Sequence, residues 1–182
     1  MIDGLLDGAR PRPDMLSLTA ALAYDRPLQG SIARWAGRLE PCPRPLAARV
    51  VRHLGQIDHF WRWQMYIERG DPHGLRIHVA GVVTALTHVL CALNGRWWPG
   101  PKWPGWTLVG LPLAPPHVLP RIRALDALHP AEAAAELEAL VEQAYDLVAA
   151  HLPEADPDRL REIFRFSRPP WPPPVPDPSQ PR

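Results

Sequence analysis

Residues 73–103 read HGLRIHVAGVVTALTHVLCALNGRWWPGPKW and join a regular apolar pattern to a cluster of tryptophans. Up to Asn94, apolar side chains recur in alternating steps of four and three residues, at Leu75, Val79, Val82, Leu86, Val89 and Leu93. This is the period of an α-helix with one buried face. The sequence therefore predicts a helix over residues 73–94, opened by Asp71-Pro72 and followed by a loop.

Two other segments have the same helical period, residues 45–69 and residues 130–151. Shorter helices are expected at residues 31–39, 117–127 and 156–166, whereas residues 16–23 fit either a strand or a short helix. The short Gly70-Asp71-Pro72 connection predicts that the helices on either side of it are antiparallel neighbours. The sequence therefore predicts an all-α fold, an antiparallel helical bundle with about three long and two or three short helices.

The composition divides the chain into three parts. Residues 1–23 contain glycines and prolines near their start and are expected to be a poorly ordered remnant or linker. Residues 24–167 are expected to form the helical bundle domain. Residues 168–182 are rich in proline and are expected to be a disordered tail.

Charge and cysteine content give few indications of a partner. The formal net charge is +1, which gives no reason to expect nonspecific binding to nucleic acid or to an acidic membrane. Cys42 and Cys91 are far apart in the sequence and are expected to be reduced thiols. The sequence has no secretory signal and no uncharged apolar run of membrane-spanning length, so a cytoplasmic protein is predicted.

The loop after the central helix is the first candidate binding site. Trp and Arg are the residue types that most often dominate the binding energy of interfaces, and Lys102 is the single lysine of the chain. The candidate binding residues in this loop are Asn94, Arg96, Trp97, Trp98, Lys102 and Trp103. The alternative interpretation is a rigid loop whose tryptophans cap the helical core.

A second candidate surface lies on the predicted helix at residues 45–69, and its members are Arg49, Arg52, His59 and Trp63. Arg52 and His59 are seven residues apart, which places both on one face of a continuous helix. This spacing resembles the Arg-x(4–6)-His motif of HEPN-type ribonucleases, in which the arginine neutralises phosphate and the histidine moves a proton. A HEPN-like ribonuclease is therefore the main alternative function.

Several familiar catalytic motifs are absent from the sequence. It contains no glycine-rich nucleotide-binding loop and no paired His and Cys spacing for zinc. It also lacks the Gly-Ser and Asp-x-Asp pair that holds two metal ions in nucleotidyl transfer. No catalytic residue, metal ligand or cofactor is predicted in this chain.

From Tyr24-Asp25 to about His151, the sequence resembles the helical domain that follows a minimal nucleotidyltransferase in a bacterial family of uncharacterised proteins. The most specific match is Leu93-Asn94-Gly95-Arg96-Trp97-Trp98-Pro99-Gly100-Pro101-Lys102-Trp103, in which Gly95 replaces an arginine of the family motif. The segments Leu22-Ala23-Tyr24-Asp25, Arg69-Gly70-Asp71 and Leu111-Pro112 occur in the expected order around it.

The resemblance implies a substrate-recognition or partner-binding half that is catalytically incomplete alone, because only about 23 residues precede Tyr24. A nucleotidyltransferase domain or subunit would then complete the site and supply Mg²⁺ and a nucleoside triphosphate. A small-molecule acceptor is the expected ligand, whereas nucleic acid and membranes are not expected partners. A third alternative is a non-catalytic interaction module that forms a homodimer.

Overall fold

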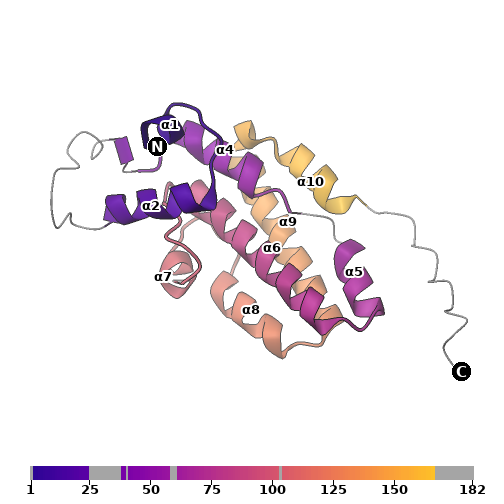
Figure 1. Ribbon diagram of the computed structural model, residues 1–182. Coiled ribbons are helices and arrows are strands. Elements are labelled where there is room, and N and C mark those ends of the chain that lie inside the picture. Colours follow the sequence, from indigo (N-terminus) through magenta and orange to yellow (C-terminus); the bar gives the residue numbers. More distant parts are fainter. Residues whose placement is uncertain (1, 25–37, 40, 58–60, 103, 167–182) are drawn as a thin grey trace, which may run out of the picture.

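A computed structural model describes residues 2–24, 38–39, 41–57, 61–102 and 104–166. In these ranges the chain is helical and contains no strand, which confirms the all-α prediction (Figure 1). The elements, in order, are α1 (Ile2–Leu6), α2 (Pro13–Tyr24), α4 (Arg44–Leu54), α5 (Trp61–Glu68), α6 (Pro72–Leu93), α7 (Pro104–Leu108), α8 (Val118–Ala124), η1 (Leu125–Ala127), α9 (Pro130–His151), η2 (Pro153–Ala155) and α10 (Pro157–Arg165).

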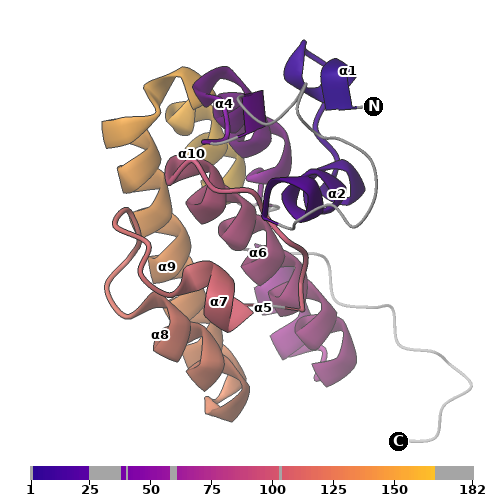
Figure 2. The same ribbon diagram turned by 90° about the vertical axis from the view of Figure 1, so that its left-hand side faces the viewer.

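The central helix of the bundle is α6, which packs against α4, α5, α7 and α9 (Figure 2). Asp71 begins it by accepting a hydrogen bond from the Gly74 amide at 2.9 Å, and Pro72 occupies the first turn. The C-terminal half of α6 is the more deeply buried, with Leu86, Val89 and Leu90 fully enclosed. The helix predicted over residues 73–94 is therefore confirmed. Length and composition alone would also allow α6 to cross a membrane; in the structure it packs against four other helices.

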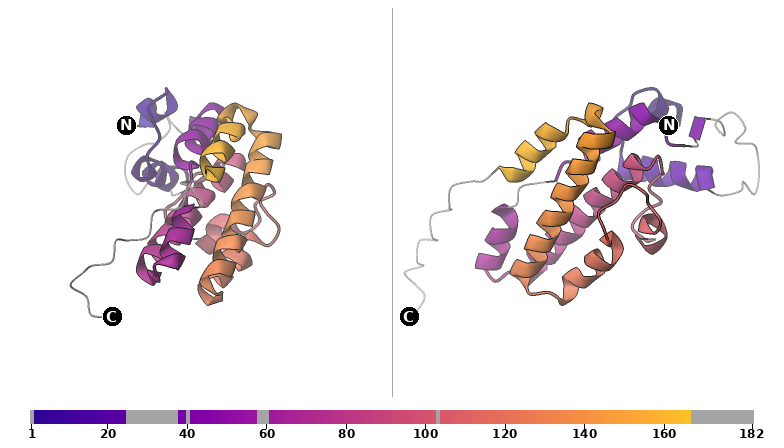
Figure 3. Two further views of the ribbon diagram at one scale, coloured as in Figure 1. Left: turned by 90° about the vertical axis from the view of Figure 1, so that its right-hand side faces the viewer. Right: turned by 180° about the vertical axis from the view of Figure 1, so that it is seen from behind.

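The second long helix, α9, spans the predicted residues 130–151 and runs beside α6 (Figure 3). His129 and Glu132 form a capping box at its start, with Pro130 in the first turn. The N-terminal parts of α6 and α9 lie together, so these two helices are parallel. The neighbours α5 and α6, and likewise α9 and α10, are antiparallel, as the short connections between them require.

The single helix predicted over residues 45–69 is wrong, because the structure has two helices there. α4 ends at Leu54, and α5 begins at Trp61 in a different direction. Gly55 closes α4 and contacts α6 so closely that only a hydrogen atom fits in place of a side chain. Its carbonyl also accepts a hydrogen bond of 2.8 Å from the Tyr145 hydroxyl of α9. The break is therefore fixed by packing against two other helices.

Gly55→Ala should lower the free energy of unfolding by about 1–3 kcal/mol, the usual cost of forcing a group into a filled core. An added Cβ would lie 2.5 Å from Val89 Cγ2 and 2.6 Å from the Val51 carbonyl oxygen. The measurement is urea denaturation. Gly81→Ala is the matched control, since nothing lies within 4 Å of a Cβ there, and it should be neutral or stabilising. Equal stability of the two variants would contradict this account of the break.

The start of the chain is more ordered than predicted. Residues 2–6 form α1, whose Ile2 and Leu5 side chains are buried in the core. Arg49 of α4 donates a hydrogen bond of 2.6 Å to the Leu5 carbonyl, at the end of α1. The segment 16–23, left open between strand and helix, belongs to α2. The remnant or linker expected at residues 1–23 therefore contributes two helices to the bundle.

The remaining predictions for short elements have mixed outcomes. The helix expected at residues 117–127 is present as α8 continued by η1, and the one expected at residues 156–166 is α10. Most of the helix expected at residues 31–39, and the tail at residues 168–182, lie outside the described residues.

Candidate binding pocket at the tryptophan loop

The loop that follows α6 is anchored by the side chain of Asn94. Its amide nitrogen donates to the carbonyls of Leu90, at 2.7 Å, and of Leu113, at 2.9 Å. Its amide oxygen accepts from the Leu113 amide at 3.0 Å. Gly95 then takes a left-handed backbone conformation, with φ of +62°, which turns the chain away from the helix. Asn94 therefore joins two loops and does not offer its amide to a ligand.

The indole rings of Trp97 and Trp98 lie inside the protein, with 2% and 7% of each residue exposed. Trp97 Nε1 donates a hydrogen bond to the Leu39 carbonyl. The Trp98 ring packs on the imidazole of His88, with ring centroids 4.3 Å apart. For these two residues the structure matches the alternative interpretation, in which the tryptophans cap the helical core.

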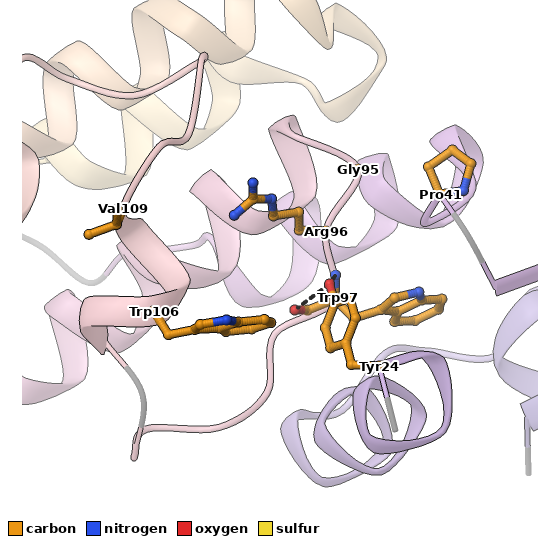
Figure 4. A pocket seen from close by; sticks show the side chains of 7 residues that line it. All are labelled: Tyr24, Pro41, Gly95, Arg96, Trp97, Trp106 and Val109. Atoms are coloured by element: carbon orange, nitrogen blue, oxygen red, sulfur yellow. Dashed lines mark hydrogen bonds between the residues drawn. The ribbon is translucent and has the colours of Figure 1, made fainter. Parts of the chain in front are cut away.

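Arg96, between Gly95 and the two buried tryptophans, lines an open pocket of about 620 Å³ (Figure 4). The other lining residues are Tyr24, Pro41, Gly95, Trp97, Trp106 and Val109. No acidic side chain lines the pocket within the described part of the chain. The Arg96 guanidinium forms no hydrogen bond or ion pair with any described residue. The pocket therefore offers an unpaired positive charge to a ligand.

The aromatic wall of the pocket is built from two elements distant in sequence. The Tyr24 hydroxyl, at the end of α2, accepts from the Trp97 amide at 2.7 Å and donates to the Trp97 carbonyl at 3.3 Å. The Tyr24 ring meets the Trp106 ring of α7 edge to face, with centroids 5.2 Å apart. Trp106 remains 54% exposed, although it is held by this contact. The wall thus presents a positioned indole to solvent.

Tyr24 and Trp106 were not among the candidate site residues. Tyr24 was noted only as part of the family resemblance, and Trp106 follows the quoted motif by three residues. Of the remaining loop candidates, Lys102 is exposed but does not line the pocket, and Trp103 lies outside the described residues. The pocket therefore shares Arg96 and Trp97 with the predicted loop site.

The second candidate surface is not assembled as predicted. Trp63 is fully buried and packs edge to face on His78 and Phe164, so it belongs to the core. Arg49 binds the end of α1, and Arg52 donates to the carbonyl of Glu154. His59 lies outside the described residues.

The HEPN-like hypothesis requires one continuous helix through residues 52–59, and this expectation is wrong. α4 ends at Leu54, so no continuous helix carries Arg52 and residue 59 on one face. The spacing of the two residues therefore no longer supports a shared site.

Burial shifts the pKa values of three titratable groups near the loop. Burial lowers the pKa of His88 to about 4 and raises the pKa of Cys42 and Cys91 to about 12. In the described ranges, no group of three or more His, Cys, Asp or Glu side chains is placed to hold a metal ion. Among the described residues of the pocket lining, Arg96 is the charged side chain and Trp106 is the most exposed aromatic side chain.

The fold and the pocket define an all-α domain with an open pocket beside the loop that follows its central helix. The chain belongs to the family of the domain of unknown function DUF4037, whose model matches residues 13–104. The matched range extends from the start of α2 to the tryptophan loop and includes Tyr24 and Arg96. No curated protein and no solved structure matches the chain.

Proposed function

We propose that this chain is a helical recognition domain that binds an anionic small molecule or partner group in the Arg96 pocket. The observation that carries the proposal is the Arg96 guanidinium, which lines a pocket of about 620 Å³ without a protein partner in the described ranges. A guanidinium binds carboxylates and phosphates through two parallel hydrogen bonds. The volume falls in the usual range for small-molecule sites, about 300–1,000 Å³.

In this proposal the domain is related to the C-terminal half of minimal nucleotidyltransferases, and the bound molecule is the acceptor of the transferred group. The relationship is supported by the motif residues Asn94, Arg96, Pro99 and Lys102. A transferase domain or subunit would contribute the metal-binding carboxylates, Mg²⁺ and the nucleoside triphosphate. The chain alone is expected to transfer no nucleotide group.

Arg96→Gln should weaken the binding of anionic ligands by roughly tenfold to a hundredfold, the cost of losing a charge-assisted hydrogen bond. A panel of carboxylates and phosphate esters would be screened by thermal shift, and the positive compounds titrated by calorimetry. Arg159→Gln, on the exposed side of α10, is the matched control and should bind as the wild type does. Undiminished binding to Arg96→Gln would show that the pocket is not the binding site.

A further inference from the structure

We infer that the ligand of this pocket is a flat aromatic ring carrying a single carboxylate or phosphate group. The ring lies against Trp106 and the anionic group binds Arg96. The inference rests on the proposed function and narrows it to one chemical class of ligand. Arg96 comes from the loop after α6 and Trp106 from α7, and both line the same opening (Figure 4).

The aromatic part is inferred from the way in which Trp106 is held. An indole that is 54% exposed leaves a large apolar surface in water. Its orientation is nevertheless fixed, because the Tyr24 ring packs against it and the Tyr24 hydroxyl is bonded twice to the Trp97 main chain. A positioned and exposed indole is a surface on which a second aromatic ring stacks with little loss of entropy.

The single anionic group is inferred from the hydrogen-bond donors of the loop. The amides of Gly95, Arg96 and Trp97 already donate to the Ala92 carbonyl, the Cys91 carbonyl and the Tyr24 hydroxyl. These amides therefore cannot form the cradle of backbone donors that binds polyphosphates. The guanidinium of Arg96 is the remaining charged donor among the described lining residues, and one guanidinium matches one carboxylate or phosphate.

The test uses calorimetric titration of the full chain with five compounds. 2-Naphthoate and 2-naphthyl phosphate carry the ring and an anionic group, and comparing them distinguishes carboxylate from phosphate. 2-Naphthamide lacks the charge, decalin-2-carboxylate lacks the aromatic ring, and ATP with Mg²⁺ represents a polyphosphate. The better naphthyl anion should bind roughly tenfold to a hundredfold more tightly than the amide. 2-Naphthoate should bind about 3- to 10-fold more tightly than decalin-2-carboxylate, which carries the same anionic group.

Two variants separate the contributions. Trp106→Leu should abolish the preference for the aromatic ring and keep the preference for the anion, whereas Arg96→Gln should do the reverse. Arg159→Gln should keep both preferences.

Equal binding of the saturated and aromatic carboxylates, with Arg96 still required, would overturn this inference and leave the proposed function intact. Tightest binding of ATP with Mg²⁺ would also overturn the inference. A ligand concentration of about 5 mM is well above the dissociation constant expected of a specific site. If neither naphthyl anion binds at that concentration, the inference is wrong. Binding of all anions without a need for Arg96 would overturn both proposals.

Discussion

Trp97→Ala should lower the free energy of unfolding by about 3–5 kcal/mol, the usual cost of removing a large aromatic side chain from a core. Trp97 is 2% exposed, and its Nε1 donates a hydrogen bond to the Leu39 carbonyl. The substitution leaves a cavity and an unpaired carbonyl at the place where α2, Leu39 and the tryptophan loop meet. Urea denaturation followed by circular dichroism measures the effect.

Trp106→Ala is the matched control, because it removes the same side chain from the neighbouring helix α7 at a position that is 54% exposed. It should cost less than about 1.5 kcal/mol, most of which is the edge-to-face contact with Tyr24. Trp97→Phe should lie between the two, since it retains most of the ring but loses the hydrogen bond. If Trp97→Ala and Trp106→Ala destabilise the protein equally, Trp97 is not part of the core.

The contrast between these two tryptophans shows what the sequence could and could not predict about the site. Composition marked the tryptophan loop as unusual, but it could not indicate which ring is buried. Burial of Trp97 depends on the Leu39 carbonyl, which lies 58 residues away in the sequence. The orientation of the exposed Trp106 ring depends likewise on Tyr24, more than eighty residues upstream in α2. Sequence patterns report on neighbours along the chain, and these contacts are not local.

The fold followed from the sequence where the signals were local. α6 starts at Asp71-Pro72 and α9 starts at His129-Pro130. At both places the capping residues and the onset of the apolar helical period indicate the same starting point. The prediction failed between α4 and α5, because the apolar period continues through Gly55 although the helix does not. There the close approach of Val89 and the hydrogen bond from Tyr145 determine the backbone. Tertiary contacts of this kind leave no periodic signal.

Acidification should destabilise the protein through His88, in the window between pH 6.5 and about 4. His88 is 3% exposed, and its Nε2 atom has no hydrogen-bond partner among the described residues. Burial lowers its pKa from 6.5 to about 4. The groups around it are Leu16 of α2, Cys42 and Val50 on the α4 side, Cys91 and Ala92 of α6, and Arg96, Trp97 and Trp98 of the loop. None of these groups is acidic, and Arg96 is itself positive, so nothing in this set stabilises a protonated imidazole.

The sign of the pH effect follows from proton binding. Below pH 6.5 the unfolded chain takes up a proton at His88, whereas the folded chain does not until about pH 4. Proton uptake therefore stabilises the unfolded state relative to the folded state. The free energy of unfolding falls by about 1.4 kcal/mol per pH unit, and by about 3 kcal/mol over the whole window. The contribution of His88 to stability is complete above pH 6.5 and is lost as the pH falls towards 4.

Urea denaturation of the wild type and His88→Gln at several pH values measures this contribution separately from that of other titrating groups. The stability of His88→Gln relative to the wild type should rise by about 3 kcal/mol between pH 7 and pH 4, because the variant binds no proton there. His73→Gln, at an exposed position in the first turn of α6, controls for the loss of a histidine as such. A constant difference between the wild type and His88→Gln across this range would mean that solvent reaches His88 in the folded state. The packing of Trp98 on His88 would then need revision.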